Sequence, residues 1–260
     1  MNIAKRAFSC TRGQFTVRGF AYKCGENNKI PVIMSHAFLS NQRIMEKYAQ
    51  VLAQEGYVVF TYDFCGGAIC GKSDGKFRDM SIDTEKEDLK AVIAYVETLN
   101  YVDMKGLILL GASQGGFVSC LVAAEYQDRV SKLVLLYPAL CIPDNARDGK
   151  MLMIQFDPEH IEETFTSRPF RFSPQYPRSA IGIDIYGEIQ KITAPMLIIH
   201  GTDDQIVDLS YARKAIDASQ NPASDLVILE KAGHGFHKAQ FRAAMGYILS
   251  YLKIQIHSLC

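Results

Sequence analysis

Residues 109–116 read LLGASQGG, which places the pattern G-x-S-x-G directly after an apolar run and directly before a helical pattern. This strand–turn–helix context is typical of a nucleophile elbow, in which glycines allow a sharp turn that exposes a serine hydroxyl. A helix that begins after Ser113 would direct its free N–H groups at a negative charge forming beside the serine. We therefore interpret Ser113 as a nucleophile. The alternative is a glycine-rich turn with an incidental serine.

An acid and a base follow further along the chain. A serine hydroxyl is a poor nucleophile by itself and needs a histidine base that is oriented by a carboxylate. The apolar run 196–200 leads into Asp203 and Asp204, and the run 226–229 leads toward His234. Open α/β sheets place their sites at the carboxyl ends of strands. The order Ser, Asp, His at strand ends therefore predicts a catalytic triad.

Short apolar runs alternate with helical patterns along most of the chain. Most of these runs are continuously apolar, which indicates strands buried on both faces, as in a parallel sheet. This alternation predicts an α/β fold with one mostly parallel central sheet flanked by helices. The sequence T-x-x-E at 84–87 predicts that a helix begins there. The expected strands are 30–35, 57–63, 106–110, 133–137, 196–200 and 226–229, and the expected helices are 43–55, 85–99, 115–126, 209–218 and 238–252.

Residues 141–189 break this alternation. They hold five of the nine prolines and several aromatic residues, and they contain no long periodic segment. A stretch of about 50 residues without a regular pattern inside a compact domain is more than a passive loop. We predict an inserted cap over 141–189, with short elements of its own, and a core formed by 1–140 and 190–260. The alternative is an aromatic-rich patch that covers one edge of the sheet.

The composition excludes several classes of protein. Of 260 residues, 48% are hydrophobic and 22% charged, as in globular proteins. Lys plus Arg and Asp plus Glu both number 28, and a net charge of zero argues against a nucleic-acid partner. No apolar run reaches the ~18–20 residues that span a bilayer, and the first residues lack a signal-peptide pattern. Seven scattered cysteines without a C-x-x-C pair indicate reduced thiols in a cytoplasmic protein, not disulfides or a zinc site.

A second glycine-rich stretch, GGAICGKS at 66–73, matches the phosphate-binding pattern G-x-x-x-x-G-K-[ST]. Such a loop needs a helix that begins at its Lys-Ser pair, so that helix N–H groups meet the phosphates. Here Ser73 is followed by Asp74, Gly75 and a stretch without apolar periodicity. We therefore interpret 66–73 as a surface loop rather than a nucleotide site.

Taken together, the motifs resemble the α/β-hydrolase superfamily, and more closely the bacterial cinnamoyl and feruloyl esterases, which are small capped carboxylesterases. The resemblance covers residues 15–252 and implies an α/β-hydrolase fold with an inserted cap. The motifs that carry it are SHAF at 35–38, YDF at 62–64, KSDGKF at 72–77, GASQG at 111–115, HGTDD at 200–204 and GHGF at 233–236.

The resemblance implies a role for each matching residue. Ser113 is expected to be the nucleophile and His234 the base. The acid of this family lies in the pattern H-G-x-x-D-x-x-V, which selects Asp204 over Asp203.

The oxyanion hole and the cap also receive assignments from the resemblance. The backbone N–H groups of Phe38 and Gln114 are expected to hold the oxyanion. In members that cleave hydroxycinnamate esters, an Asp and a Tyr of the cap face the hydroxyl groups of the aromatic ring. Position in the chain assigns these substrate-binding roles to Asp144 and Tyr176, and the alternative is that both are ordinary cap residues.

Two departures from the family pattern affect the expected site. Ala37 stands where the family usually has glycine, and an alanine there is strained if the position needs a positive φ. The loop 65–71 is longer than the short turn common in the family, so it is expected to crowd or reshape the rim of the site.

The sequence thus predicts a cytoplasmic serine carboxylesterase that forms an acyl-enzyme on esters with bulky or aromatic, hydroxycinnamoyl-like acyl groups. We expect a small-molecule ester as the partner, no nucleic acid, no membrane, and no metal or organic cofactor; a homodimer is left open. Two alternatives are a serine peptidase or amidase on small acyl-peptides, and a non-catalytic small-molecule binding protein on the same scaffold. The intact Ser, Asp and His argue against the second alternative.

Overall fold

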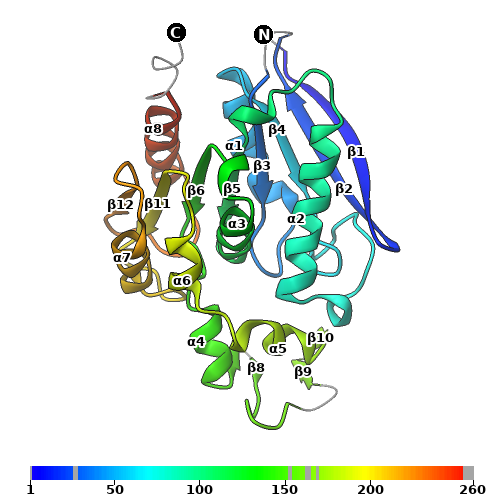
Figure 1. Ribbon diagram of the computed structural model, residues 1–260, viewed down its shortest axis with the longest axis vertical. Coiled ribbons are helices and arrows are strands. Elements are labelled where there is room, and N and C mark those ends of the chain that lie inside the picture. The colour runs from blue at the N-terminus through cyan, green and yellow to red at the C-terminus, as the bar shows by residue number, and fades with distance from the viewer. Residues whose placement is uncertain (1, 26–28, 152–153, 162–164, 168–169, 254–260) are drawn as a thin grey trace.

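The fold is built on a mostly parallel sheet (Figure 1). The computed structural model describes residues 2–25, 29–151, 154–161, 165–167 and 170–253. Within these ranges the central sheet has eight strands, and β2 pairs antiparallel with β1 and β4 while the other neighbours are parallel. The predicted fold class is confirmed. In spatial order the strands are β1 (Ala4–Arg12), β2 (Phe15–Lys23), β4 (Val58–Tyr62), β3 (Pro31–Ser35), β5 (Ile108–Ala112), β6 (Lys132–Leu136), β11 (Met196–Gly201) and β12 (Asp225–Leu229).

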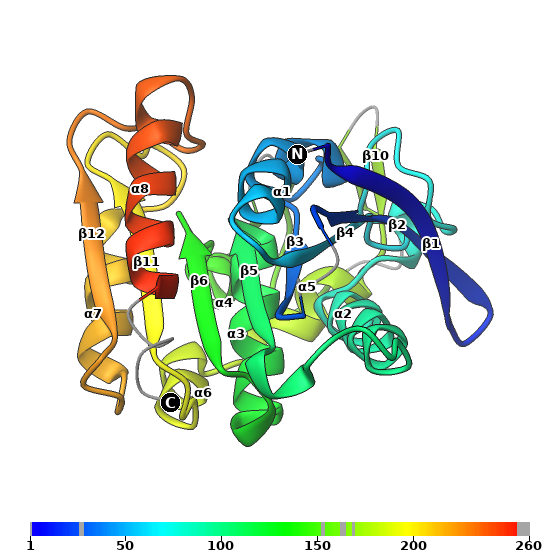
Figure 2. The same cartoon turned by 90° about the horizontal axis from the view of Figure 1, so that it is seen from above.

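Helices cover both faces of the sheet (Figure 2). One face packs against α1 and α8, and the other against α2, α3, α6 and α7. Alternate residues of β3 therefore enter different cores, Val32 and Met34 on the α1 side and Ile33 on the α3 side. Burial on both faces explains the continuous apolar runs. The helices are α1 (Glu46–Gln54), α2 (Ile82–Glu97), α3 (Gln114–Glu125), α6 (Ile185–Gln190), α7 (Leu209–Ala218) and α8 (Ala239–Lys253), with the 3₁₀ turns η1 (Gln42–Met45), η2 (Phe77–Asp79), η3 (Met104–Gly106) and η4 (Gln127–Arg129).

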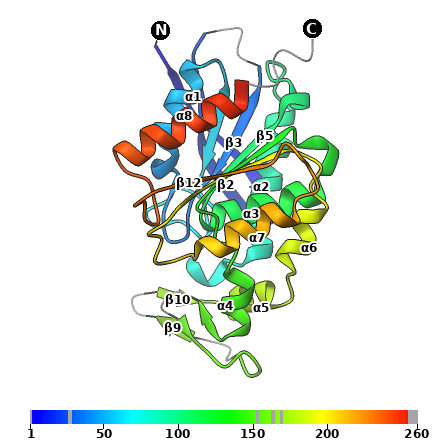
Figure 3. The ribbon, with the colours of Figure 1, turned by 90° about the vertical axis from the view of Figure 1, so that its left-hand side faces the viewer.

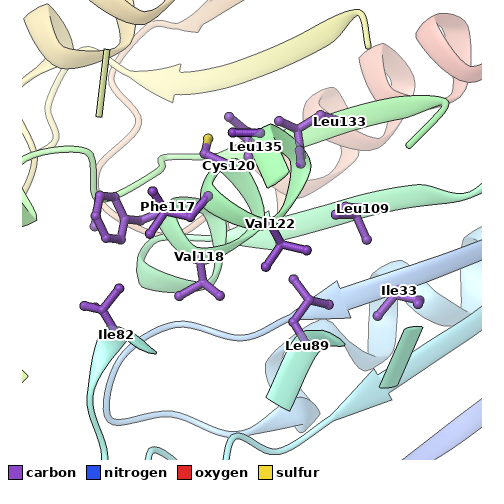
Figure 4. Packing of buried hydrophobic residues seen from close by; sticks show 14 of the residues in the cluster. Ile33, Ile82, Leu89, Leu109, Phe117, Val118, Cys120, Val122, Leu133 and Leu135 are labelled. Carbon is purple, nitrogen blue, oxygen red and sulfur yellow. The ribbon is translucent and has the colours of Figure 1, made fainter. Parts of the chain in front are cut away.

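The core around α3 fixes the helix that follows the predicted nucleophile. Figure 4 shows α3 side chains, among them Phe117 and Val122, packed with Leu89 of α2 and with strand residues such as Leu109. All residues from Gln114 to Ala124 are buried. A close-packed interior of this kind holds its backbone rigidly. The start of α3 is therefore a fixed platform for Ser113.

The hairpin of β1 and β2 was not among the expected elements. β1 lies at the edge of the sheet, and most of its side chains are exposed. Its residues are mostly polar or small, so the segment carries no continuous apolar run. Gly13, with a φ of 56°, forms the turn between the two strands. An exposed edge strand lacks the burial that makes other strands visible in a sequence.

The predicted beginning of α2 is wrong by three residues. Ser81 is the N-cap, and its side chain accepts a hydrogen bond from the Thr84 N–H at 3.1 Å. The Thr84 hydroxyl in turn accepts from the Ser81 N–H at 2.8 Å. Thr84 therefore takes the position that the T-x-x-E interpretation gave to Glu87. Glu87 is exposed and forms an ion pair with Lys90 instead.

The segment between β6 and β11 contains short elements. Figures 1 and 3 show α4, α5 and the hairpin of β9 and β10 gathered at one end of the molecule, beyond the sheet. α6 instead packs against α3 and α7 of the core. The division into a core and a cap over 141–189 stays a prediction. The elements are α4 (Ile142–Arg147), β7 (Lys150–Met151), β8 (Ile154–Gln155), β9 (Phe165–Ser167), β10 (Phe170–Phe172) and α5 (Gln175–Ile181).

The phosphate-loop-like segment 66–73 is held as a loop. No helix begins at Lys72 or Ser73, and the next element is η2. The Ser73 hydroxyl accepts a hydrogen bond from the Arg18 N–H at 2.8 Å, and the Lys72 N–H donates to the Asp63 carboxylate at 2.8 Å. These bonds tie the segment to β2 and to the end of β4, without the helix N-terminus that phosphate binding requires.

The part of the chain that the structure describes contains no helix that is long and apolar enough to span a bilayer.

Candidate active site

The serine of the G-x-S-x-G pattern sits on a strained turn between β5 and α3. Ser113 has φ 52° and ψ −118°, a conformation that costs a non-glycine residue of order 1–3 kcal/mol. Two glycines make the turn possible, since a Cβ on Gly111 would lie 2.3 Å from the Gly115 carbonyl oxygen. A Cβ on Gly115 would lie 2.4 Å from the Ser35 carbonyl oxygen. Larger residues at these two positions would push apart β3, β5 and α3.

Three side chains from separate strand ends meet in one hydrogen-bonded chain. The Ser113 Oγ lies 2.8 Å from His234 Nε2, and His234 Nδ1 lies 2.8 Å from Asp204 Oδ2. Because a carboxylate only accepts, Nδ1 carries the proton and Nε2 is free to accept the serine proton. Burial alone would raise the pKa of the Asp204 carboxyl. Hydrogen bonds from His200, His234 and two backbone N–H groups instead hold its pKa well below the usual range.

An acid and a histidine close in sequence to the triad lie elsewhere. Asp203 is exposed and accepts a hydrogen bond from the Thr202 hydroxyl at 2.9 Å. His237 is also exposed. The structure therefore brings together Ser113, Asp204 and His234, the set that the sequence motifs selected.

A second histidine supports the acid and was missed in the sequence. His200, at the end of β11, is fully buried, and its Nε2 lies 3.3 Å from Asp204 Oδ2 and 3.0 Å from the Val207 carbonyl oxygen. The available signal was the pattern H-G-x-x-D, which puts a histidine four residues before the acid.

The residues expected to hold the oxyanion lie beside Ser113. Gln114 begins α3, so its N–H lies in the first turn, where helix N–H groups lack intrahelical partners. Phe38 lies in the loop after β3 and lines the same cavity as Ser113 and Gln114. In this loop Leu39 has the positive φ, 50°, and Ala37 does not. The expected strain at Ala37 is therefore absent.

The buried His36 anchors this loop. The Phe64 N–H donates to His36 Nε2 at 3.1 Å, so the ring proton lies on Nδ1 and is donated to the Ala37 carbonyl oxygen at 2.8 Å. Burial lowers the pKa of His36, which favours this neutral form. His36 thereby joins the loop after β3 to the residues after β4, a role that sequence reasoning did not assign.

The long loop 65–71 packs beside the oxyanion segment without entering the cavity. Ile69 N–H donates to the Ser40 carbonyl oxygen at 2.8 Å, and the Asn41 side chain donates to the Ile69 carbonyl oxygen at 2.8 Å. None of residues 65–71 lines the cavity at Ser113. These bonds hold the loop against residues 40–41, outside the lining of the cavity, and its effect on the rim of the site stays a prediction.

The cavity beside Ser113 is small and mostly apolar. Its volume is about 40 Å³. Its walls come from the loop after β3, the start of α3, the α4–β7 region, α5 and the loop that carries Asp204. The lining residues are Phe38, Ser113, Gln114, Ala139, Cys141, Ile142, Asn145, Met151, Tyr176, Ile206 and Val207.

The two predicted substrate-binding residues have other partners. Tyr176 lines the cavity, but its buried hydroxyl donates a hydrogen bond to the side-chain oxygen of Gln114. Asp144 does not line the cavity. Its carboxylate binds Arg147 at 2.7 Å and accepts from the Tyr211 hydroxyl of α7 at 2.9 Å. The helical turn of α4 directs Asp144 toward α7 and places the next residue, Asn145, in the cavity wall.

Among the described residues, no group of three or more His, Cys, Asp or Glu side chains is arranged to hold a metal ion.

Comparison with known proteins agrees with this geometry. Residues 43–255 match the sequence profile of the prolyl oligopeptidase family. The chain belongs to this family. Its members share the α/β-hydrolase fold, so the fold expected from the sequence motifs is confirmed. The triad geometry gives this prolyl oligopeptidase family member the arrangement of a serine hydrolase.

Relatives and solved structures support the same assignment. Alpha/beta hydrolase domain-containing protein 17B of Homo sapiens is 27% identical over 216 residues, and the match covers 82% of this chain but only 62% of that protein. Monoglyceride lipase of Mus musculus is 25% identical over 238 residues, covering 81% of this chain and 77% of the lipase. The solved structure of Est1E from Butyrivibrio proteoclasticus with bound ferulic acid has a TM-score of 0.86 and 25% identity, covering 94% of this chain and 99% of Est1E.

Proposed function

We propose that this family member is a serine carboxylic-ester hydrolase that acts through an acyl-enzyme. The observation that carries the proposal is the hydrogen-bonded chain from Ser113 through His234 to Asp204, which opens onto a cavity lined by Phe38 and Gln114. A non-catalytic binding protein has no need of a strained serine that is hydrogen-bonded to a histidine.

The reaction follows from the placement of these groups. Ser113 Oγ attacks the ester carbonyl carbon while His234 Nε2 takes its proton, and Asp204 stabilises the resulting imidazolium. The backbone N–H groups of Phe38 and Gln114 donate hydrogen bonds to the carbonyl oxygen as negative charge develops on it. His234 then gives its proton to the leaving alcohol. Water, activated by the same histidine, releases the acid from Ser113.

We further propose that the acyl group is apolar and aromatic, as in hydroxycinnamoyl esters. Two stacked rings in the wall, Phe38 and Tyr176, support this choice, and so does the likeness to Est1E with ferulic acid bound. At about 40 Å³ the cavity is far below the ~300–1,000 Å³ of pockets that hold drug-sized ligands. An aromatic acyl group would therefore lie against the wall formed by Phe38 and Tyr176 rather than be enclosed by the cavity. Ring contacts, rather than hydrogen bonds to ring hydroxyls, would select it.

A serine peptidase or amidase is the second candidate, favoured by the match to the prolyl oligopeptidase family. Fold alone does not decide which bond is cleaved.

One set of substrates tests the proposed function and separates the candidates. Rates are measured on p-nitrophenyl acetate, butyrate and octanoate, on methyl cinnamate, and on the p-nitroanilides of the same acyl groups and of short acyl-peptides. Cleavage of the esters, methyl cinnamate included, without measurable cleavage of any anilide or peptide anilide supports an esterase. Faster cleavage of peptide anilides would replace it with the peptidase, and no cleavage of any ester would overturn the proposal.

A further inference from the structure

Three buried polar side chains form a chain that runs from the core into the region of the predicted cap. Glu85 of α2 accepts a hydrogen bond from Gln114 Nε2 at 2.7 Å. The Tyr176 hydroxyl of α5 donates to the Oε1 of the same amide. All three residues are buried. Both ends of the Gln114 amide are therefore held, one by the core and the other by the segment between β6 and β11.

Tyr176 contacts the second residue expected to hold the oxyanion as well. Its ring stacks on the ring of Phe38, with centroids 5.4 Å apart and planes inclined by 5°. Phe38 lies in a loop whose next residue, Leu39, has a φ of 50°, so this backbone is held in a conformation that is unusual for a leucine. Tyr176 thus contacts Phe38 through its ring and Gln114 through its hydroxyl.

We propose that Tyr176 is a positioning residue for the oxyanion hole, with Glu85 as the buried anchor of the same hydrogen-bonded chain. This inference rests on the proposed function, since it assigns a task within the same site. Through Tyr176, the segment between β6 and β11 also holds Phe38 and Gln114, the two residues whose N–H groups would donate to the oxyanion.

Glu85 is suited to an anchoring role because it is buried and accepts from Gln114, and among the described residues no ion pair of Glu85 competes for its carboxyl oxygens. Asp88, one turn further along α2, has the Arg12 ion pair and a hydrogen bond from the Cys65 N–H at 2.7 Å. Burial, and secondarily the nearby Asp88, raise the pKa of Glu85 to about 8, against the lowering effect of Gln114. A carboxyl group keeps an acceptor oxygen whether or not it is protonated. The bond from Gln114 therefore survives in both forms.

A positioning role and a substrate-binding role of Tyr176 predict different kinetic effects. A tyrosine that binds the acyl group would affect only substrates that reach it, chiefly through KM. A tyrosine that holds the oxyanion donors affects the chemical step for every acyl group, because oxyanion stabilisation is specific to the transition state. The deciding property is therefore whether the loss of kcat is the same for every acyl group.

The test compares Tyr176→Phe, Glu85→Met and Glu85→Gln on p-nitrophenyl acetate, p-nitrophenyl butyrate and methyl cinnamate. Tyr176→Phe and Glu85→Met should each lower kcat roughly tenfold on all three esters, with KM within about twofold of the unaltered chain. Glu85→Gln keeps the shape and one acceptor oxygen, and should restore kcat to within about threefold. Thermal unfolding verifies that each variant is folded.

A second readout does not depend on turnover. The affinity for phenylboronic acid, which forms a tetrahedral adduct on a catalytic serine, and the rate of labelling by a fluorophosphonate should fall by the same factor as kcat. Two matched controls should stay within about twofold on every readout. Tyr186→Phe removes a buried hydroxyl of α6 that has no hydrogen-bond partner among the described residues, and Glu87→Gln alters an exposed acid of α2.

Several outcomes would overturn the inference. One is a Tyr176→Phe effect confined to KM for methyl cinnamate, since it would make Tyr176 a substrate contact. Another is a loss of kcat in Glu85→Gln as large as that in Glu85→Met, since it would show that the hydrogen-bond acceptor at position 85 does not determine the rate. Absence of ester turnover by the unaltered chain would count against the proposed function instead, and the labelling rates would then decide the positioning role.

Discussion

His200 Nε2 lies 3.3 Å from Asp204 Oδ2, the oxygen that also accepts the hydrogen bond from His234. His200 Nε2 also donates to the Val207 carbonyl oxygen, and the buried Nδ1 has no hydrogen-bond partner among the described residues. Leaving such an atom unpaired costs ~1–3 kcal/mol. The hydrogen bonds that Nε2 makes to Asp204 and to the Val207 carbonyl oxygen offset this cost, and they hold both the acid and the loop that carries it.

Replacing His200 by leucine should lower kcat/KM roughly tenfold on p-nitrophenyl acetate. The apolar side chain fills a similar space but gives no hydrogen bond to Asp204, so the orientation of His234 is less well fixed. Stability should change little, since the unpaired Nδ1 is removed as well. His160→Leu, at an exposed histidine, is the control and should leave the rate unaltered. Full activity of the His200 variant would mean that the ring only fills space.

The two neighbouring acids should respond very differently to amidation. Asp204→Asn should lower kcat by roughly 10³–10⁴-fold, because an amide can donate to His234 and thereby select the wrong tautomer. Asp203→Asn should stay within about threefold, because the Asp203 side chain is exposed and its carboxylate accepts a hydrogen bond from the Thr202 hydroxyl, outside the triad. Steady-state kinetics on a single p-nitrophenyl ester suffice. A larger loss from Asp203→Asn would show that the loop after β11 has another register.

Glu85 should make stability depend on pH. Its pKa is raised to about 8 by burial, whereas an unfolded Glu titrates near ~4.3. The folded chain therefore binds more protons between these values, and the free energy of unfolding falls as the pH rises through this window. The glutamine in Glu85→Gln cannot ionise. The Tm of this variant minus the Tm of the unaltered chain should therefore rise from pH 5 to pH 8 and then level off. Glu87→Gln should show no such trend. A Tm difference independent of pH would refute the expectation.

Hydroxyl groups on an aromatic acyl group should matter little. The Tyr176 hydroxyl is bound to Gln114, and Asp144 is bound to Arg147 and Tyr211, so neither offers a free polar group to the cavity. Methyl ferulate and methyl cinnamate should therefore have kcat/KM values within about threefold of each other. A site that hydrogen-bonds a hydroxyl rejects the analogue without it by far more. A large preference for ferulate would show that these side chains exchange partners when substrate binds.

The sequence predicted the triad because each of its members follows a strand in a short motif. Ser113 and His234 need only local patterns and the rule that sites lie at strand ends, whereas the choice of Asp204 over Asp203 came from the family resemblance. The bond between Tyr176 and Gln114 joins residues 62 positions apart and depends on how α5 packs. Local pattern carries no information on such a contact, so the resemblance to other esterases led to a substrate-binding role instead.

The errors in the fold have a similar physical origin. β1 was missed because an exposed edge strand has no apolar run. The start of α2 was misplaced because two overlapping capping patterns were present, and Ser81 rather than Thr84 takes the N-cap. The strands β3, β4, β5, β6 and β11 were predicted because burial on both faces leaves a continuous apolar run in the sequence. β12 lies at the other edge of the sheet and is only partly buried, but its apolar run at 226–229 still marked it as a strand.

The identity of the nucleophile is tested most directly by peptide mapping after treatment with a fluorophosphonate probe. We expect one phosphonylated residue, Ser113, with labelling abolished in Ser113→Ala and reduced roughly in step with kcat in Asp204→Asn. Ser113→Ala should keep its Tm and lose at least about 10³-fold in kcat. Stable labelling of another serine, or undiminished ester hydrolysis by Ser113→Ala, would contradict the central claim.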